Sequence, residues 1–185
     1  MQSPDRPSQS LIKLVDLAVI PAAILIFTKI ISLLVLNSYL GLNWDVKAFS
    51  DAFFGIRLTY VSDQDIVKVV SYSDLFMHIA ALSGAVLALS KLYYLHPKYI
   101  NPAMVLKLAK KDSLHYIQSS FHMYHEAIVW CAFLIISDLL IIINFIQNLT
   151  FDWVLGVSII STLVVIFILV RTVDRDIYTK NIKYK

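Results

Sequence analysis

The feature that most constrains this chain is an apolar run, Ala127–Ile146, which carries one formal charge, Asp138, near its middle. About twenty apolar residues are what a helix needs to cross the hydrocarbon core of a bilayer. Three similar runs occur, so the predicted spans cover about 14–36, 75–95, 121–146 and 153–170. Lipid satisfies no backbone polar groups, and we therefore expect these runs to be helices packed against one another. The sequence predicts an all-α integral membrane four-helix bundle that forms a single domain.

Composition supports a membrane protein. Hydrophobic residues make up 58% of the 185, and only four glycines occur. A soluble domain of this size would carry more charge and more turn residues. The single cysteine, Cys131, excludes an intramolecular disulfide and a cysteine-based zinc pattern. The lysines flank the spans and form no separate basic domain, so nucleic acid is not an expected partner.

Positive residues indicate the orientation. The connection between the second and third spans is rich in lysine, and the C-terminal tail, 171–185, is also basic. The turn 147–152 has no positive residue. Cytoplasmic loops carry an excess of lysine and arginine, so we expect both termini in the cytoplasm, N-in and C-in. A bacterial or archaeal plasma membrane fits this bias, with an organelle membrane as the alternative.

The segment 37–73 is the longest one outside the predicted spans and would face outward. Apolar residues recur at helical spacing from Trp44 to Phe53, which predicts a short helix at the membrane surface. Ile56–Val61 and Ile66–Tyr72 are rich in β-branched and aromatic residues, and the polar residues between them suit the turn of a β-hairpin. An irregular loop is the alternative to that hairpin. Residues 1–10 are polar and are expected to form a disordered tail.

Two shorter patterns predict contacts with lipid and with other helices. Beyond Pro102, lysines oppose apolar residues, which predicts a basic amphipathic helix on anionic lipid headgroups. The lysines concerned are Lys107, Lys110 and Lys111. In the second span, small residues repeat every four positions and allow close helix packing. These residues are Ala80, Gly84 and Ala88. We expect them to pack against a neighbouring helix of the same chain, with homodimer contact as the alternative.

Ionisable residues inside predicted spans are costly in hydrocarbon and are the first candidates for a site. At about 1.5 Å of rise per residue, Lys29 and Asp138 differ in depth by only a few ångströms, which predicts a pair. His78 lies further outward and is expected to be able to join them. A structural ion pair that fixes the helix register is the favoured interpretation. A proton or ion path is the second interpretation. In the third, the Lys29 side chain reaches outward to the interface and leaves Asp138 protonated or bonded to a serine.

Histidines near the cytoplasmic boundary are the second candidates. His115, His122 and His125 recur along the third helix, and His96 ends the second span. Imidazole binds zinc, copper, iron and haem, so a metal or haem site there is one hypothesis. The simpler interpretation is that they are polar residues at a helix end. Most of them come from one helix, whereas a haem needs ligands on opposed helices.

No catalytic residues are predicted, because the sequence contains no GxSxG, no phosphate-binding loop and no dinucleotide fingerprint. The leading interpretation is a non-enzymatic accessory or assembly component of a membrane complex. It would bind a protein partner, or copies of itself, through the segment 37–73. The alternatives are a metal- or haem-binding redox protein that uses the histidines, and a small transporter or channel subunit that uses Lys29 and Asp138.

Overall fold

The computed structural model describes residues 7–42, 44–48, 56–60, 62–94, 105–106, 110 and 120–183. Four long helices account for most of these residues: α1 (Pro7–Tyr39), α2 (Asp63–Tyr94), α4 (Ser120–Ile146) and α5 (Asp152–Lys183). Each contains an apolar stretch long enough to cross a membrane, at Ala18–Tyr39, Asp63–Tyr94, His122–Ile146 and Asp152–Arg175. The predicted four-helix membrane bundle is confirmed, and the protein is a multi-pass membrane protein.

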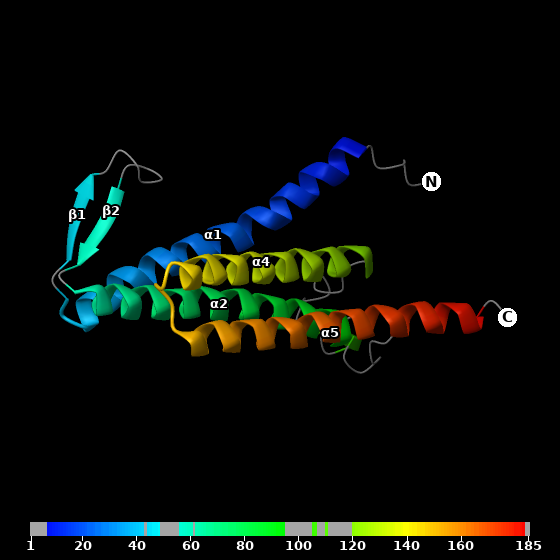
Figure 1. The fold of residues 1–185 in the computed structure, drawn as a ribbon. Coiled ribbons are helices and arrows are strands. Elements are labelled where there is room, and N and C mark those ends of the chain that lie inside the picture. Colours follow the sequence, from blue (N-terminus) through cyan, green and yellow to red (C-terminus); the bar gives the residue numbers. More distant parts are fainter. Residues whose placement is uncertain are drawn as a thin grey trace.

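The helices run alongside one another, with both ends of the chain at one end of the bundle and the hairpin at the other (Figure 1). Helix α2 is the most buried of the four spans and packs against α1, α4 and α5. Helix α1 is the least buried, and its N-terminal part diverges from α4 (Figure 1). The bundle is therefore built around α2.

Small residues of α2 form the centre of the core. Ala81, Ala85 and Ala88 are almost completely buried, and they lie in one apolar cluster with Leu134 and Ala127 of α4. Alanines at these positions let the helix backbones approach closely, which is how helices associate in lipid. The close contact between α2 and α4 forms the centre of the bundle, and α1 and α5 pack against it.

Helix α2 begins about twelve residues earlier than predicted, and this corrects one part of the sequence interpretation. The stretch Ile66–Tyr72, expected as a strand, is helical. The carbonyl of Ser62 accepts the backbone N–H groups of Asp65 and Ile66 at 3.1 and 3.4 Å. Asp63 and Asp65 lie in the first turn, where negative charge favours the helix dipole. These local signals outweigh the strand propensity of the β-branched residues.

A hairpin is present, and one of its two strands is the expected one: the predicted strand Ile56–Val61 corresponds to β2, whereas its partner precedes it in the chain instead of following it. Strand β1 (Trp44–Ala48) pairs antiparallel with β2 (Ile56–Tyr60), with Trp44 opposite Tyr60. The predicted surface helix is therefore wrong over Trp44–Ala48. Positions four apart lie on one face of a helix and also of a strand, so the apolar residues at 44 and 48 fit both. The rest of the expected helix, 49–55, lies outside the described residues.

Two further expectations are affected. Helix α1 begins at Pro7, so residues 7–10, expected in the disordered tail, are helical. The predicted basic amphipathic helix falls largely outside the described residues, as do Lys107 and Lys111. Val105, Leu106 and Lys110 are helical, and the Lys110 side chain is exposed.

Aromatic clusters at the two ends of α2 indicate where the bilayer lies. Tyr72 contacts Phe151 and Trp153, with ring centroids 6.2 and 6.3 Å apart. At the other end, Tyr93 stacks edge-on against Tyr94 and lies under the Arg175 guanidinium, whose carbon is 5.0 Å from the ring centroid. From Tyr72 to Tyr93 the helix rises about 31 Å, close to the thickness of the hydrocarbon core. Aromatic residues favour the interfaces, so we expect the first two turns of α2 to project beyond the membrane.

Candidate functional site: a buried polar cluster

The first polar group is centred on Asp74 of α2, whose side chain is only 1% exposed. Lys29 of α1 forms an ion pair with one oxygen of this carboxylate and also donates to Ser73 Oγ at 2.8 Å. The other oxygen accepts hydrogen bonds from Asn144 Nδ2 at 2.8 Å and from Thr150 Oγ1 at 3.1 Å. Asp74 therefore joins α1, α2, α4 and the turn after α4 through one carboxylate.

The turn between α4 and α5 is shaped to supply Thr150. Asn148 has a positive φ of 58° and ends α4, with Leu149 N–H donating to the Asn144 carbonyl at 2.8 Å. This is a Schellman-type end, and asparagine tolerates its left-handed conformation better than most residues. Ser71 Oγ accepts the Phe151 N–H at 3.0 Å and so ties the turn to α2. Ser71 and Asp74 together fix the turn against the outer part of α2.

The second polar group lies one helical turn further along α2, around His78, which is 1% exposed. Its Nε2 is 2.8 Å from Ser161 Oγ of α5. Its Nδ1 is 3.0 Å from Ser137 Oγ and 3.2 Å from Asp138 Oδ1, both on α4. The two hydroxyls donate to carbonyls of their own helices at 2.8 and 2.9 Å. With those protons committed, each seryl oxygen can accept a hydrogen bond from a ring nitrogen that carries a proton.

Asp138 differs from Asp74 in how it is satisfied. Its Oδ1 is buried and accepts no hydrogen bond from the described residues, although it lies at ion-pair distance from His78. Asp74, by contrast, has partners on both oxygens. The two buried aspartates therefore have different environments: Asp74 has hydrogen-bond partners on both oxygens, whereas Asp138 Oδ1 has, in the described part of the chain, only the nearby His78 ring.

The structure brings the predicted intramembrane residues together in a different pairing. Lys29 contacts Asp74 instead of Asp138, while Asp138 faces His78. Asp74 lies one residue outside the predicted second span, 75–95, so hydropathy does not mark it as a buried charge. A signal was present, since Asp74 and His78 are four residues apart and such residues share a helix face.

Asn37, near the end of α1, meets the end of the hairpin. It is 2% exposed, and neither its amide oxygen nor its amide nitrogen is hydrogen-bonded to a described residue. Burial raises the pKa of the Tyr60 hydroxyl above its usual range, an effect that the Asn37 side chain partly offsets. Contacts between β2 and α2 also place this end of the hairpin on the bundle.

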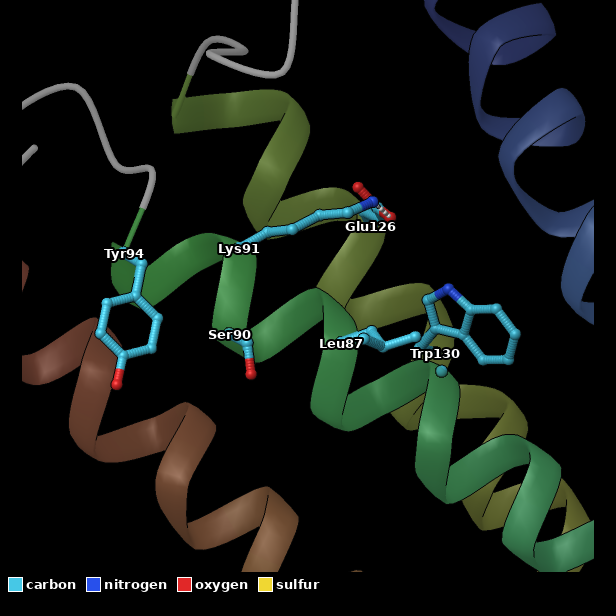
Figure 2. A pocket seen from close by; sticks show the side chains of 7 residues that line it. Leu87, Ser90, Lys91, Tyr94, Glu126 and Trp130 are labelled. Atoms are coloured by element: carbon cyan, nitrogen blue, oxygen red, sulfur yellow. Dashed lines mark hydrogen bonds and ion pairs between the residues drawn. The ribbon is translucent and has the colours of Figure 1, made fainter. Parts of the chain in front are cut away.

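A pocket of about 440 Å³ lies near the opposite end of α2 (Figure 2). Both termini lie at this end of the bundle (Figure 1). Lys91 of α2 donates to Glu126 Oε1 of α4 at 2.6 Å across the rim of the pocket. We call it the Lys91–Glu126 pocket. Its lining consists of Gly84, Leu87, Ser90, Lys91, Tyr94, Glu126 and Trp130.

Two of the three small residues predicted for helix packing, Gly84 and Ala88, are buried where α2 meets α4. Gly84 is buried, and a side chain placed there would overlap the Trp130 ring. Ala88 is buried in the core, while Ala80 is half-buried. The Trp130 ring thus occupies the space that a larger residue at position 84 would need.

Two of the four histidines of the predicted metal site belong to the described residues. His96 and His115 lie outside the described residues, whereas His122 and His125 lie in the first two turns of α4 and are half-buried. Within the described parts of the chain, no three histidine, cysteine, aspartate or glutamate side chains are placed to hold a metal ion.

Neither a family model, nor a curated protein, nor a solved structure matches the chain. The chemistry of its polar groups is therefore the basis for an assignment. Between His78 and Lys91, about 20 Å of helix, every buried residue of α2 is apolar. The polar groups of the described α2 interior are thus concentrated in the half nearest the hairpin, and α2 offers no continuous polar route between the two ends of the bundle.

Proposed function

We propose that this protein is a non-enzymatic accessory or assembly component of a membrane complex. The proposal is based on the hydrogen bonds of the Asp74 carboxylate. They connect α2 to α1, α4 and the α4–α5 turn, through Lys29, Asn144 and Thr150 respectively. Buried polar groups that are completely bonded favour one helix arrangement over others. A bundle fixed in this way, with an apolar interior along α2 between His78 and Lys91, suits a structural scaffold better than an ion or substrate path.

The hairpin is the part of this scaffold that we expect to bind the partner. Each of its strands pairs with the other, so the outer edge of each faces no third strand among the described residues. An isolated two-stranded hairpin is marginally stable, and unpaired strand edges readily accept another chain. We place this end outside the cytoplasm and the protein in a plasma membrane, following the distribution of lysine and arginine.

The transporter and redox alternatives receive less support. The Lys29–Asp138 pair on which a transport path was based is replaced by two separate pairs. A redox role would need ligands from residues that include His96 and His115, for which no contacts are described. Purified protein with a visible absorbance band or a stoichiometric metal would favour the redox alternative over our proposal.

The test is purification from native membranes in styrene–maleic acid particles, using a C-terminally tagged full chain. We expect a protein in fixed stoichiometry with the 21.1 kDa chain, either another polypeptide or further copies of itself. A variant in which residues 44–60 become a glycine–serine linker of equal length should lose it. A second variant, with the same replacement over 176–185, should keep it.

Mass measurement of the extracted particles decides the outcome. Particles that hold a single chain and no other stoichiometric protein would overturn the proposal. Retention of the partner by the linker variant would leave assembly intact but remove the hairpin as its binding surface.

A further inference from the structure

We propose that the Lys91–Glu126 pocket binds the headgroup of a zwitterionic phospholipid that carries a primary ammonium, namely phosphatidylethanolamine. The pocket combines opposite charges at its rim with an apolar floor (Figure 2). Its volume of about 440 Å³ lies in the range of small-molecule pockets, about 300–1,000 Å³.

The depth of the charged rim matches that of lipid headgroups. Lys91 is three residues from the end of α2, and Glu126 is four residues into the apolar stretch that starts at His122. At 1.5 Å per residue, both lie about 5–6 Å inside the ends of their spans. Lys91 also precedes Tyr93 and Tyr94 by two and three residues, and we take these aromatic residues to mark the interface at this end of the bundle. A lipid phosphate and ammonium would occupy this same layer.

The apolar floor continues from the rim toward the middle of the bundle. Leu87 precedes Lys91 by one turn of α2, and Trp130 follows Glu126 by one turn of α4, so both lie closer to the middle of the bundle than the charged pair (Figure 2). The Leu87 side chain is 64% exposed, so in a membrane it faces lipid. A headgroup held at the rim would therefore lay the start of an acyl chain along Leu87 and the Trp130 ring.

The charges at the rim select the headgroup. The Lys91 side chain is 42% exposed and can bind a phosphate oxygen, while the Glu126 carboxylate can accept from an ammonium. A headgroup that lies across the ion pair places its phosphate beside Lys91 and its ammonium beside Glu126. The 2.6 Å contact between Lys91 and Glu126 therefore need not break. A primary ammonium donates hydrogen bonds to a carboxylate, whereas the quaternary ammonium of phosphatidylcholine has no proton to donate. An anionic lipid would meet Lys91 favourably but Glu126 unfavourably.

Trp130 provides a direct probe once the other two tryptophans are replaced. The protein with Trp44→Phe and Trp153→Phe would be reconstituted in phosphatidylcholine vesicles. A small, fixed fraction of the lipid would be phosphatidylethanolamine, phosphatidylcholine or phosphatidylglycerol with brominated acyl chains, which quench tryptophan fluorescence on contact. We expect the ethanolamine lipid to bind about three- to fivefold better than the other two, the size of one partly exposed charged contact.

Variants then assign the selectivity to the pair. Glu126→Gln should remove the preference over phosphatidylcholine, and Lys91→Met should reduce quenching by all three lipids. Lys68→Met is the matched control, because Lys68 forms a comparable exposed pair with Asp65, at 3.8 Å, at the other end of α2. It should leave quenching unchanged.

The comparison of the three lipids needs no change at the pocket, so it stands even where a pocket variant fails to fold. Equal quenching by the three lipids, or strongest quenching by phosphatidylglycerol, would overturn the proposal. A full ethanolamine preference in a correctly folded Glu126→Gln variant would also overturn it.

Discussion

Two buried aspartates on neighbouring helices differ in how their carboxylate oxygens are hydrogen-bonded, and therefore in how much stability their substitution should remove. Asp74 receives an ammonium, an amide and a hydroxyl, whereas Asp138 Oδ1 receives no hydrogen bond from the described residues. A charge stripped of one partner in a buried site is strongly destabilising, because it keeps its desolvation penalty without compensation. An acceptor that is already unsatisfied has less to lose on substitution.

We therefore predict that Asp74→Asn and Lys29→Met each lower the free energy of unfolding by about 2–4 kcal/mol. We set this somewhat below the loss expected for a completely buried pair, because the Lys29 side chain is 25% exposed. The double variant should lose less than the sum of the two. Unfolding in mixed micelles, followed by circular dichroism, measures all three.

Asp138→Asn is the matched substitution and should change stability by less than about 1 kcal/mol. The substitution leaves His78 beside an uncharged amide, and an imidazole is readily neutral near pH 7, whereas an alkyl ammonium is not. Asp138→Asn should also combine additively with Lys29→Met. Strong coupling between positions 29 and 138 would restore the pair that the sequence predicts and contradict the contacts described here.

At this scale the sequence identifies which residues matter better than it identifies their partners. Lys29, His78 and Asp138 are all recognisable as charges or polar groups in apolar runs. Their partners depend on Asp74, which becomes a buried charge only because α2 starts at Asp63. Pairing depends on helix rotation and relative height, and neither is encoded in hydropathy.

At the scale of elements, the α2–α4 contact depends on one glycine. The Trp130 ring lies where a side chain at position 84 would be, whereas a side chain at Gly156 of α5 would meet nothing within 4 Å. Overpacking a close helix contact forces side chains or backbones to move. Away from such contacts, alanine is the better helix former.

Gly84→Ala should therefore lower the unfolding free energy by about 1–3 kcal/mol, with a shift in Trp130 fluorescence. Gly156→Ala should be neutral or stabilising by up to about 1 kcal/mol. Thermal unfolding in one detergent compares the pair directly. If both substitutions behaved alike, Trp130 would not pack on Gly84 as the structure has it.

The elements themselves were predictable to the extent that hydrophobic length alone defines them. Every span follows from an apolar run, but helices continue past the apolar residues: α2 starts about twelve residues before the predicted span, and α5 ends about thirteen residues after it. The hairpin was less predictable, because Trp44–Ala48 fits both periodicities and its pairing with Ile56–Tyr60 depends on the chain that joins them. Apolar length is a strong signal, whereas short amphipathic segments are ambiguous.

At the scale of the whole molecule, the two ends of the bundle differ. Both termini lie at the end with Lys91, and the hairpin lies at the other (Figure 1). The predicted cytoplasmic location of the termini follows from where lysine and arginine gather, since positive loops are retained on that side. This orientation can be tested with the structure. The start of α2 extends beyond the Tyr72 interface, so it provides exposed residues on the hairpin side of the bundle.

We predict that Lys68→Cys reacts with a membrane-impermeant maleimide in intact cells, and that Lys110→Cys reacts only after the cells are permeabilised. Both side chains are exposed, and they lie on the two sides that the charge bias assigns to the outside and the cytoplasm. Cys131, the native thiol, is buried and is first replaced by alanine. Val86→Cys is the matched control: the valine is 47% exposed but lies between the two aromatic clusters, so lipid should shield it in both conditions. Reaction of Lys110→Cys in intact cells would reverse the orientation, and with it the side on which the hairpin can meet a partner.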